Sequence, residues 1–185
     1  MQPKNGNQPK ITIRALDEKN FTGLNQCDDA FIVDSKLCLS VASDKITYTL
    51  VPVPRYEKRY SVEKVDYSAY IRDPDKAAFL AYVNEQIAGQ IILRKSWNGF
   101  AYIENLAVDS QFRKLGVGRK VIAQAVEWAK AKNLSGLMLE TQNNNVGACR
   151  FYERCGFRLG GFDNFLYRDT NRETDEVALF WYLLF

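Results

Sequence analysis

Residues 111–120 read Gln-Phe-Arg-Lys-Leu-Gly-Val-Gly-Arg-Lys and place two glycines, one residue apart, among basic side chains. A loop that joins a strand to a helix exposes unpaired backbone N–H groups, and glycines let the chain curl so that several of them point at one spot. Such a spot attracts an anion, most naturally a phosphate. The alternative is a tight turn with solvated basic side chains, and the loop alone leaves both interpretations open.

The spacing of the glycines excludes two familiar phosphate-binding loops. A P-loop has four residues between its glycines, followed by Lys and Ser or Thr, whereas one residue separates Gly116 from Gly118. A dinucleotide-binding fingerprint needs glycine or alanine at position 121, where Val121 stands, and a preceding strand in a parallel sheet. Neither motif fits.

The sequence contains no histidine, which removes the usual general base and the commonest metal ligand. Catalysis must then use carboxylates, tyrosines, the backbone or water, and no metal site is predicted. Cys149 and Cys155 suggest a covalent acyl-cysteine, but neither has a histidine to activate it. We interpret both as packing residues.

The composition bounds the class of protein. With 185 residues and 46% hydrophobic content, the chain is predicted to form a single domain over residues 11–185, after a flexible tail at residues 1–10. The net charge of +3 comes from 25 basic and 22 acidic residues in an even mixture, which argues against a nucleic-acid partner. The cysteines lack CxxC spacing, and no signal peptide or membrane-length apolar run is found. These features predict a reduced, cytoplasmic protein without a membrane partner.

Hydrophobic periodicity predicts the elements that position the glycine loop. Prolines 52 and 54 are expected to end the first strand, and Asn98-Gly99 is expected to form a two-residue hairpin loop because both residue types tolerate positive φ. The three strands from residue 77 to residue 108 should pair antiparallel. The predicted strands cover 46–53, 77–83, 87–94, 101–108, 135–141, 161–168 and 176–185, and the predicted helices cover 116–134 and 145–157.

Two linked motifs resemble the GNAT superfamily of N-acetyltransferases. The loop matches its Arg/Gln-x-x-Gly-x-Gly/Ala motif, and residues 145–157 match Asn-x-x-Ala-x-x-Phe-Tyr-x-x-x-Gly-Phe. The resemblance implies an α+β, three-layer α/β/α fold whose mixed, mostly antiparallel sheet splays into a V-shaped gap, with acetyl-coenzyme A as the co-substrate. The matching residues are Arg113, Gly116, Gly118, Asn145, Ala148, Phe151, Tyr152, Gly156 and Phe157.

The resemblance also assigns residues to the co-substrate. The N–H groups of residues 115–119 would hold its pyrophosphate, and exposed backbone in residues 106–108 would pair with pantetheine. Asn145 would hydrogen-bond the same arm. The implied binding residues are Leu106, Ala107, Val108, Arg113, Lys114, Leu115, Gly116, Val117, Gly118, Arg119, Asn145 and Tyr152.

Acetyl transfer to an amine requires a neutral amine, a polarised carbonyl and a proton for the departing thiolate. Without histidine, Glu104 is the candidate base, or else a binder of the cationic acceptor. It stands two residues before Leu106, on the same face under regular alternation. The Leu106 N–H is the expected oxyanion donor. Tyr152 would protonate the thiolate, and the alternative for Tyr152 is a buried aromatic of its helix.

A narrower resemblance, from about Tyr48 to the C-terminus, is to streptothricin acetyltransferases. It implies acetylation of the β-lysine amine of that antibiotic and hence resistance, by a monomer or homodimer. Acceptor recognition would use carboxylates and aromatic faces. The candidates are Glu104, Asp163, Trp97, Tyr48, Tyr56 and Tyr67. Alternatives are a GNAT enzyme for a polyamine, an aminoglycoside, a protein N-terminus or a lysine, and a non-catalytic acyl-coenzyme A sensor.

Overall fold

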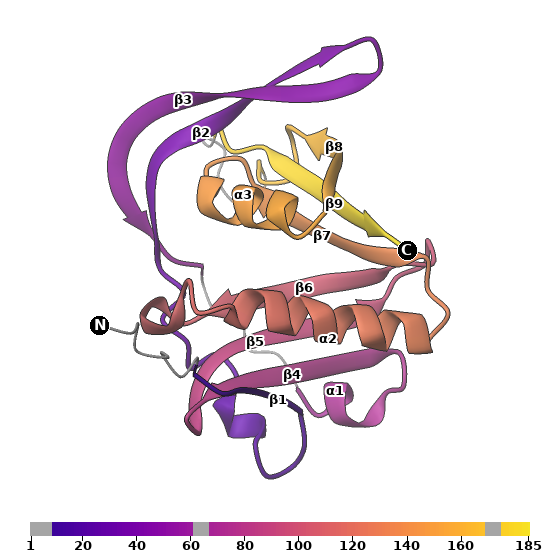
Figure 1. The fold of residues 1–185 in the computed structure, drawn as a ribbon. Coiled ribbons are helices and arrows are strands. Elements are labelled where there is room, and N and C mark those ends of the chain that lie inside the picture. Colours follow the sequence, from indigo (N-terminus) through magenta and orange to yellow (C-terminus); the bar gives the residue numbers. More distant parts are fainter. Residues whose placement is uncertain (1–8, 61–66, 169–174) are drawn as a thin grey trace, which may run out of the picture.

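The computed structural model describes residues 9–60, 67–168 and 175–185, so most of the expected tail lies outside the described residues. A seven-stranded sheet has the order β1-β4-β5-β6-β7-β9-β8, and a separate ribbon of β2 and β3 arches over one end of it (Figure 1). Every strand pair is antiparallel except β6 with β7, which confirms the mixed, mostly antiparallel sheet. The sheet strands are β1 (Ile11–Ala15), β4 (Lys76–Val83), β5 (Gln86–Lys95), β6 (Ala101–Val108), β7 (Gly136–Gln142), β8 (Arg158–Asp163) and β9 (Ala178–Leu184).

Helices cover both faces of this sheet. The longest, α2 (Val117–Ala131), and α3 (Val146–Arg154) pack on one face, while the short α1 (Ala69–Arg72) packs on the other beside β4. The predicted helical spacing is confirmed in α2, whose apolar stripe is buried. The buried stripe of α2 consists of Val117, Val121, Ile122, Ala125 and Ala129.

No helix in the described ranges has the length and apolar character that a membrane span requires.

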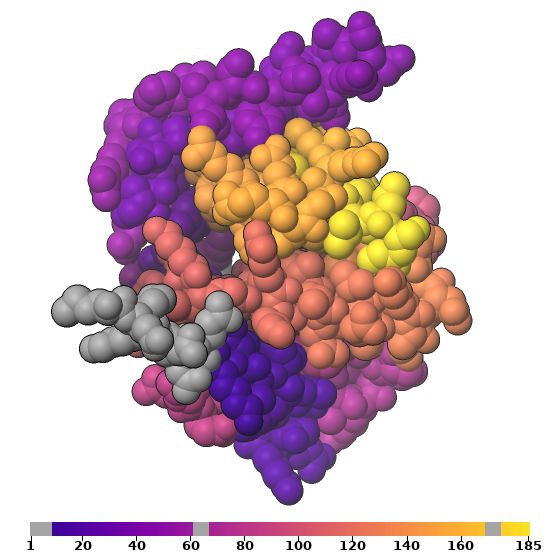
Figure 2. Space-filling model, viewed as in Figure 1, coloured from indigo at the N-terminus to yellow at the C-terminus, as the bar shows by residue number. Residues whose placement is uncertain are grey.

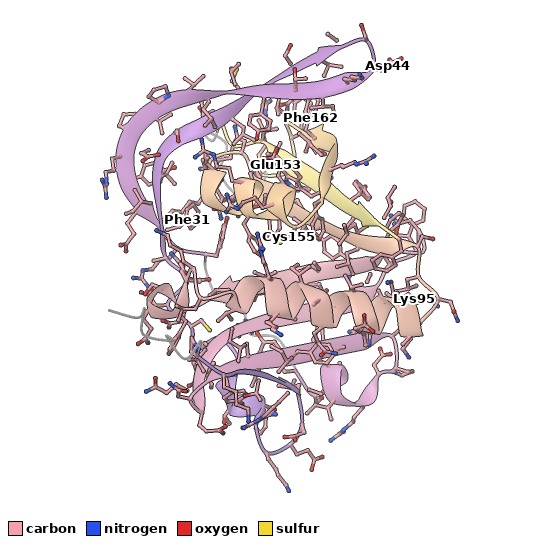
Figure 3. All side chains as sticks on the ribbon, in the orientation of Figure 1. Phe31, Asp44, Lys95, Glu153, Cys155 and Phe162 are labelled. Carbon is pink, nitrogen blue, oxygen red and sulfur yellow. The ribbon has the colours of Figure 1, made fainter. Side chains whose placement is uncertain are left out.

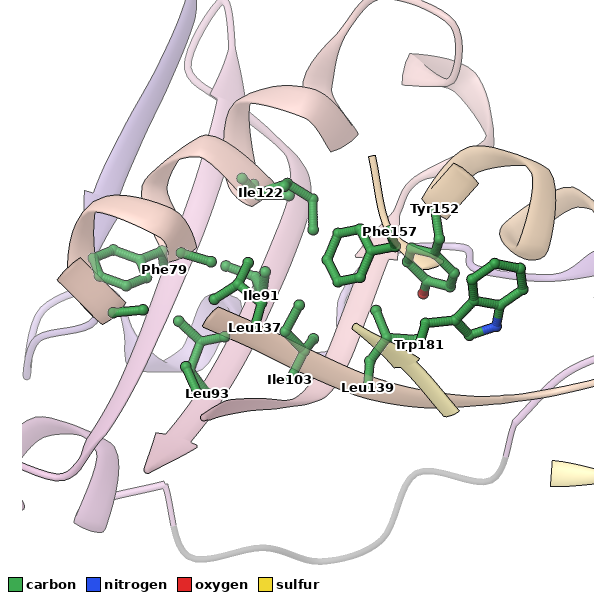
Figure 4. Close-up of a cluster of buried hydrophobic side chains, with 14 of the residues drawn as sticks. Phe79, Ile91, Leu93, Ile103, Ile122, Leu137, Leu139, Tyr152, Phe157 and Trp181 are labelled. Carbon is green, nitrogen blue, oxygen red and sulfur yellow. The ribbon is translucent and has the colours of Figure 1, made fainter. Parts of the chain in front are cut away.

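Two apolar clusters lie on the two faces. In β4 the residues alternate between them, so that Phe79 and Ala81 face α2 whereas Leu80 and Tyr82 face α1. The α2-face cluster continues across β7 to Trp181 of β9, whose ring lies beside that of Tyr152 (Figure 4). This division assigns each strand residue to one of two sides, which we call the α2 face and the α1 face.

The sheet opens between its two halves. Strands β6 and β7 pair through three residue pairs, the last of which is Ile103 with Leu139. Beyond that pair β6 continues to Val108 along β5 alone, while β7 continues to Gln142 along β9 alone. The expected V-shaped gap is therefore present, with its apex at Ile103 and Leu139.

The β2–β3 ribbon corrects the prediction for the amino-terminal half. Strand β2 (Phe31–Ala42) was not expected, and β3 (Lys45–Lys58) runs through both prolines that were expected to end it. Proline is tolerated at the edge of a sheet or at a bulge, because no ladder hydrogen bond is lost there. Pro52 pairs with Ser35 in a two-stranded ribbon, and Pro54 lies in the irregularity that follows that pair.

Two further expectations need correction. The hairpin between β5 and β6 has a three-residue loop, since the Ser96 N–H donates to Phe100 O (2.8 Å) and only Gly99 has positive φ (+83°). The strand expected over residues 161–168 lies at Arg158–Asp163 instead. It ends there because the Asp163 carboxylate accepts from the Phe165 N–H (2.7 Å) and starts a turn.

Candidate active site

The glycine loop forms the start of α2. Gly116 is its N-cap residue with φ of +94°, and Lys114 also has positive φ, so the chain turns sharply before the first helical residue. The buried Val117 anchors the loop, while Arg113, Lys114, Leu115 and Arg119 are exposed. The opening N–H groups of the helix thus face solvent among basic side chains, and this loop fits a phosphate-bearing ligand.

Gly118 allows a contact between helices. A Cβ atom at this position would lie 2.9 Å from Cζ of Phe151 on α3, which is closer than real Cβ contacts. The second glycine therefore lets the Phe151 ring approach α2 next to the loop. Figure 2 shows the surface hollowed where α3, the start of α2 and the β2–β3 ribbon meet.

The open edge of β6 offers backbone groups to the gap. The Asp109 N–H donates to Ala88 O (3.1 Å) on the β5 side. Because N–H groups alternate along a strand, those of Val108 and Leu106 point away from β5, and that of Ala107 points toward it. Arg113 Nε donates to Val108 O (3.2 Å), so this side chain joins the loop to the end of β6.

Asn145 and Tyr152 belong to α3. The Asn145 side chain caps the helix by accepting from the Ala148 N–H (3.1 Å), and its Nδ2 donates to the Tyr60 hydroxyl (3.1 Å). Tyr152 is buried among the rings of Phe157 and Trp181 (Figure 4). Burial raises the pKa of Tyr152 above its usual range, so its hydroxyl stays protonated near neutral pH.

A β-bulge places Glu104 on the α1 face. Leu93 pairs with Ile103 and Ile92 with Asn105, so that Glu104 is the extra residue of β6. The expectation that Glu104 and Leu106 share a face is wrong, because the bulge interrupts the alternation on which it rested. Leu106 packs on the α2 face. The Glu104 carboxylate accepts from Tyr70 Oη (2.7 Å) and Arg94 Nε (3.0 Å), both of which lie on the α1 side.

A second carboxylate, Glu140, was not predicted as a site residue. It lies in β7 between the buried Leu139 and Thr141, and the Tyr167 hydroxyl donates to its Oε1. The charges of Glu140 and Glu104 both act on Tyr102, whose pKa is raised first by burial and then by them. A carboxylate that directly follows the apolar run Leu137–Leu139 within a strand was the sequence signal that could have revealed Glu140.

The remaining candidates for acceptor binding do not lie together in the structure. The Asp163 carboxylate accepts a hydrogen bond from the Phe165 N–H in the turn after β8. Trp97 is 96% exposed in the β5–β6 hairpin loop, so nothing holds it toward Glu104. Tyr56 accepts from Asn144 Nδ2 (3.1 Å), whereas Tyr67 accepts from Asn25 Nδ2 on the α1 face.

Three consecutive asparagines fasten the ribbon to the sheet. The backbone O of Asn143 accepts from the Leu37 N–H (2.9 Å) and its side chain donates to Leu37 O (3.2 Å). Asn144 Nδ2 also donates to Glu176 Oε1 (2.9 Å). On the other side of α3, the Tyr48 hydroxyl donates to Glu153 Oε1 (2.7 Å), and Figure 3 shows Glu153 beneath the ribbon. Tyr48 is therefore a tether of the ribbon in this structure.

The cysteines have the properties of packing residues. Cys149 is fully buried, and burial raises the pKa of its thiol to about 12. Burial also raises the pKa of the half-buried Cys155, although the nearby Arg119 and Arg154 oppose this. Thiols that stay protonated are poor nucleophiles, which agrees with the packing interpretation.

The chain is similar to known proteins over most of its length. Residues 43–157 match the acetyltransferase (GNAT) family. Streptothricin acetyltransferase A of Bacillus subtilis (strain 168) is 38% identical over 175 residues, which cover 94% of this chain and 99% of that protein. A streptothricin acetyltransferase of Escherichia coli is 34% identical over 174 residues, covering 94% and 91%.

Solved structures agree with the sequence relatives. A candidate streptothricin acetyltransferase from Bacillus anthracis str. Ames, crystallised with acetyl coenzyme A, is 47% identical with a TM-score of 0.88 and covers 97% of this chain and 99% of its own. Nourseothricin acetyltransferase is 29% identical with a TM-score of 0.79, covering 94% and 98%. Both likenesses include the β2–β3 ribbon as well as the glycine loop, since they span nearly the whole chain.

Proposed function

The chain belongs to the GNAT acetyltransferase family, and from this premise we propose that it transfers the acetyl group of acetyl-coenzyme A to an amine of streptothricin. It is an acetyl-coenzyme A-dependent N-acetyltransferase. The choice of acceptor rests on one observation, the 38% identity to a streptothricin acetyltransferase over 94% of the chain. That span includes the ribbon and β8, which a shared donor alone would leave free to vary.

The glycine loop and the open edge of β6 form the proposed donor side. The N–H groups of residues 115–119 would hold pyrophosphate, with Arg113, Lys114 and Arg119 adding charge. The backbone of Leu106 and Val108 would pair with the pantetheine arm, and Asn145 retains one amide N–H for it. When bound, acetyl-coenzyme A supplies the acetyl thioester.

The gap between β6 and β7 connects the donor side to the proposed acceptor side on the α1 face. The Leu106 N–H points into this gap and would stabilise negative charge on the acetyl oxygen. Tyr152 would protonate the departing sulfur, for which a tyrosine that remains protonated is suited.

On the acceptor side we assign Glu104 to binding. Tyr70 and Arg94 hold its two oxygens in place, so the carboxylate is oriented and its charge is already balanced. An oriented carboxylate on the α1 face supports recognition of a polycation, because charge-assisted hydrogen bonds to ammonium groups are strong. Asp163 would add charge at the far end of the same face.

Acetylation removes a positive charge from the antibiotic and would thereby confer resistance. The purified protein should release free thiol from acetyl-coenzyme A in the presence of streptothricin and raise the antibiotic's mass by one acetyl group at the β-lysine amine. Spermidine and an aminoglycoside serve as competing acceptors. Thiol release with either of those but none with streptothricin would disprove the acceptor while leaving the family activity intact.

A further inference from the structure

Glu140 is the carboxylate that β7 contributes at the apex of the gap. It is the first residue of β7 after the Leu139 pair at which β6 parts from β7. Its backbone pairs with Phe180 of β9 on the side away from the gap. Leu139 belongs to the α2-face cluster, so alternation turns the Glu140 side chain to the α1 face, where Glu104 also lies.

Among the described residues, no cation balances the charge of Glu140. Among residues 9–60, 67–168 and 175–185, Arg94 pairs with Glu104 and Lys58 pairs with Glu176, while Glu140 forms no ion pair. Its described hydrogen bond comes from Tyr167 and uses Oε1. A half-buried carboxylate without a neighbouring cation destabilises the folded protein, unless a bound ligand supplies the cation. The oxygen lone pairs of Glu140 that Tyr167 does not use are suited to an ammonium group.

Burial raises the pKa of the Glu140 carboxyl, and the hydrogen bond from Tyr167 lowers it while the charge of Glu176 raises it further. A carboxylate with a raised pKa is a stronger base than an exposed glutamate. Glu104 differs, because both of its oxygens are occupied and a guanidinium balances its charge. The other ionisable groups whose charges interact with Glu140 are Tyr60, Tyr102, Cys149, Tyr152 and Tyr167.

We propose that Glu140 is the residue that binds the reacting ammonium group of the acceptor and removes its proton, and that Tyr167 orients it. This inference rests on the proposed function, because it presumes an amine acceptor on the α1 face. It moves the role of base from Glu104 on β6 to the facing strand.

The proton balance of the step is as follows. One proton of the acceptor R–NH3+ passes to Oε2 of Glu140, and the freed lone pair forms the N–C bond to the acetyl carbon as the C–S bond breaks. The nitrogen loses its second proton to water, and the sulfur takes one from Tyr152, which is reprotonated from solvent. Glu140 then returns its proton to solvent, so one proton is released per turnover.

The experiment compares Glu140→Gln with wild type and with Glu127→Gln, which removes an exposed carboxylate of α2. Thiol release is measured against pH, using streptothricin or whichever panel amine the wild type acetylates best. Glu140→Gln should lower kcat by ~10²-fold or more, the usual contribution of a general base, and should abolish the acidic limb of the profile. Glu127→Gln should behave as wild type.

Calorimetry without acetyl-coenzyme A gives a second measurement, in which streptothricin should bind Glu140→Gln at least tenfold more weakly. Tyr167→Phe removes the hydroxyl that lowers the Glu140 pKa, so the acidic limb of this variant's profile should move to higher pH. This variant also tests the proposal if Glu140→Gln fails to fold.

Wild-type kcat and an unchanged acidic limb in these variants would overturn the inference while leaving the acceptor assignment standing. If the wild type acetylates only another amine, the streptothricin assignment is wrong, and the same variants test the role of Glu140 with that amine. If the wild type is inactive with every amine, both the proposed function and the role of Glu140 are wrong.

Discussion

Glu104 and Glu140 are the first residues of β6 and β7 beyond the Ile103–Leu139 pair, so the two carboxylates flank the apex of the gap from facing strands. Their surroundings differ. Glu104 is held by a guanidinium and a tyrosine, whereas within the part of the chain that the structure describes Glu140 is held by Tyr167 and forms no ion pair. The two strands thus part at one residue pair and carry two carboxylates there, of which Glu104 has a cation beside it and Glu140 has none among the described residues.

Replacing Gly118 with valine should weaken acetyl-coenzyme A binding by about tenfold or more, equivalent to about 1.4 kcal/mol. The new side chain must displace the Phe151 ring beside the loop, because a Cβ already lies 2.9 Å from it. Isothermal titration calorimetry measures the affinity. Ala123→Val, on the exposed side of the same helix, controls for the helix propensity of valine. Full affinity in a folded Gly118→Val protein would reduce the loop to a structural turn.

Tyr152→Phe keeps the ring that packs on Phe157 and Trp181 and removes the proposed proton donor. We expect kcat to fall by ~10²-fold with little change in acetyl-coenzyme A affinity. The melting temperature should not fall, because the hydroxyl makes no hydrogen bond within the described residues. Equal turnover in the two proteins would mean that water or another acid protonates the sulfur.

Asp163→Asn should raise the KM for streptothricin severalfold and leave that for acetyl-coenzyme A unchanged. Asparagine can still accept from the Phe165 N–H, so the substitution tests charge and not the turn. Asp73 accepts from the Asp75 N–H in a similar turn beside α1, and Asp73→Asn is the matched control. If both variants have wild-type KM values, Asp163 serves only the turn.

The elevated pKa of Glu140 predicts how stability depends on pH. An unfolded glutamate titrates near ~4.3, so the folded state binds the proton more tightly. The stabilising effect of the protonated carboxyl is complete below that pH and is lost as pH rises through the folded pKa. Glu140→Gln should therefore melt above wild type at pH 7–8, by about 2–4 °C for each kcal/mol, and the difference should vanish near pH ~4. Calorimetric melts that keep a constant difference across this range would contradict the prediction.

The elements of the proposed donor side could be predicted from the sequence because their signals are local. The helical stripe of α2 and the alternation of β4, β5 and β6 each bury a continuous face, and the glycine loop is contiguous. Gly118 was expected to let the loop curl around an anion, and the structure adds its close approach to Phe151.

The acceptor half depends on contacts that the sequence pattern does not specify. The bulge at Glu104 is an offset between two strands, and the Tyr167–Glu140 contact joins residues 27 positions apart through a turn that was expected to be a strand. Strand β2 of the ribbon was not predicted because it buries only Val33 and Leu37 strongly, which is too few residues for a clear period.

The strand order also governs how the protein can be made. The edge of β7 that carries the Glu140 backbone pairs with β9, whose residues Ala178–Leu184 are synthesised about forty positions later. Until they emerge from the ribosome, that edge presents unpaired N–H and C=O groups beside the apolar residues of β7, a template for intermolecular pairing. Chains that stall or are truncated between β7 and β9 should therefore be the aggregation-prone species during synthesis.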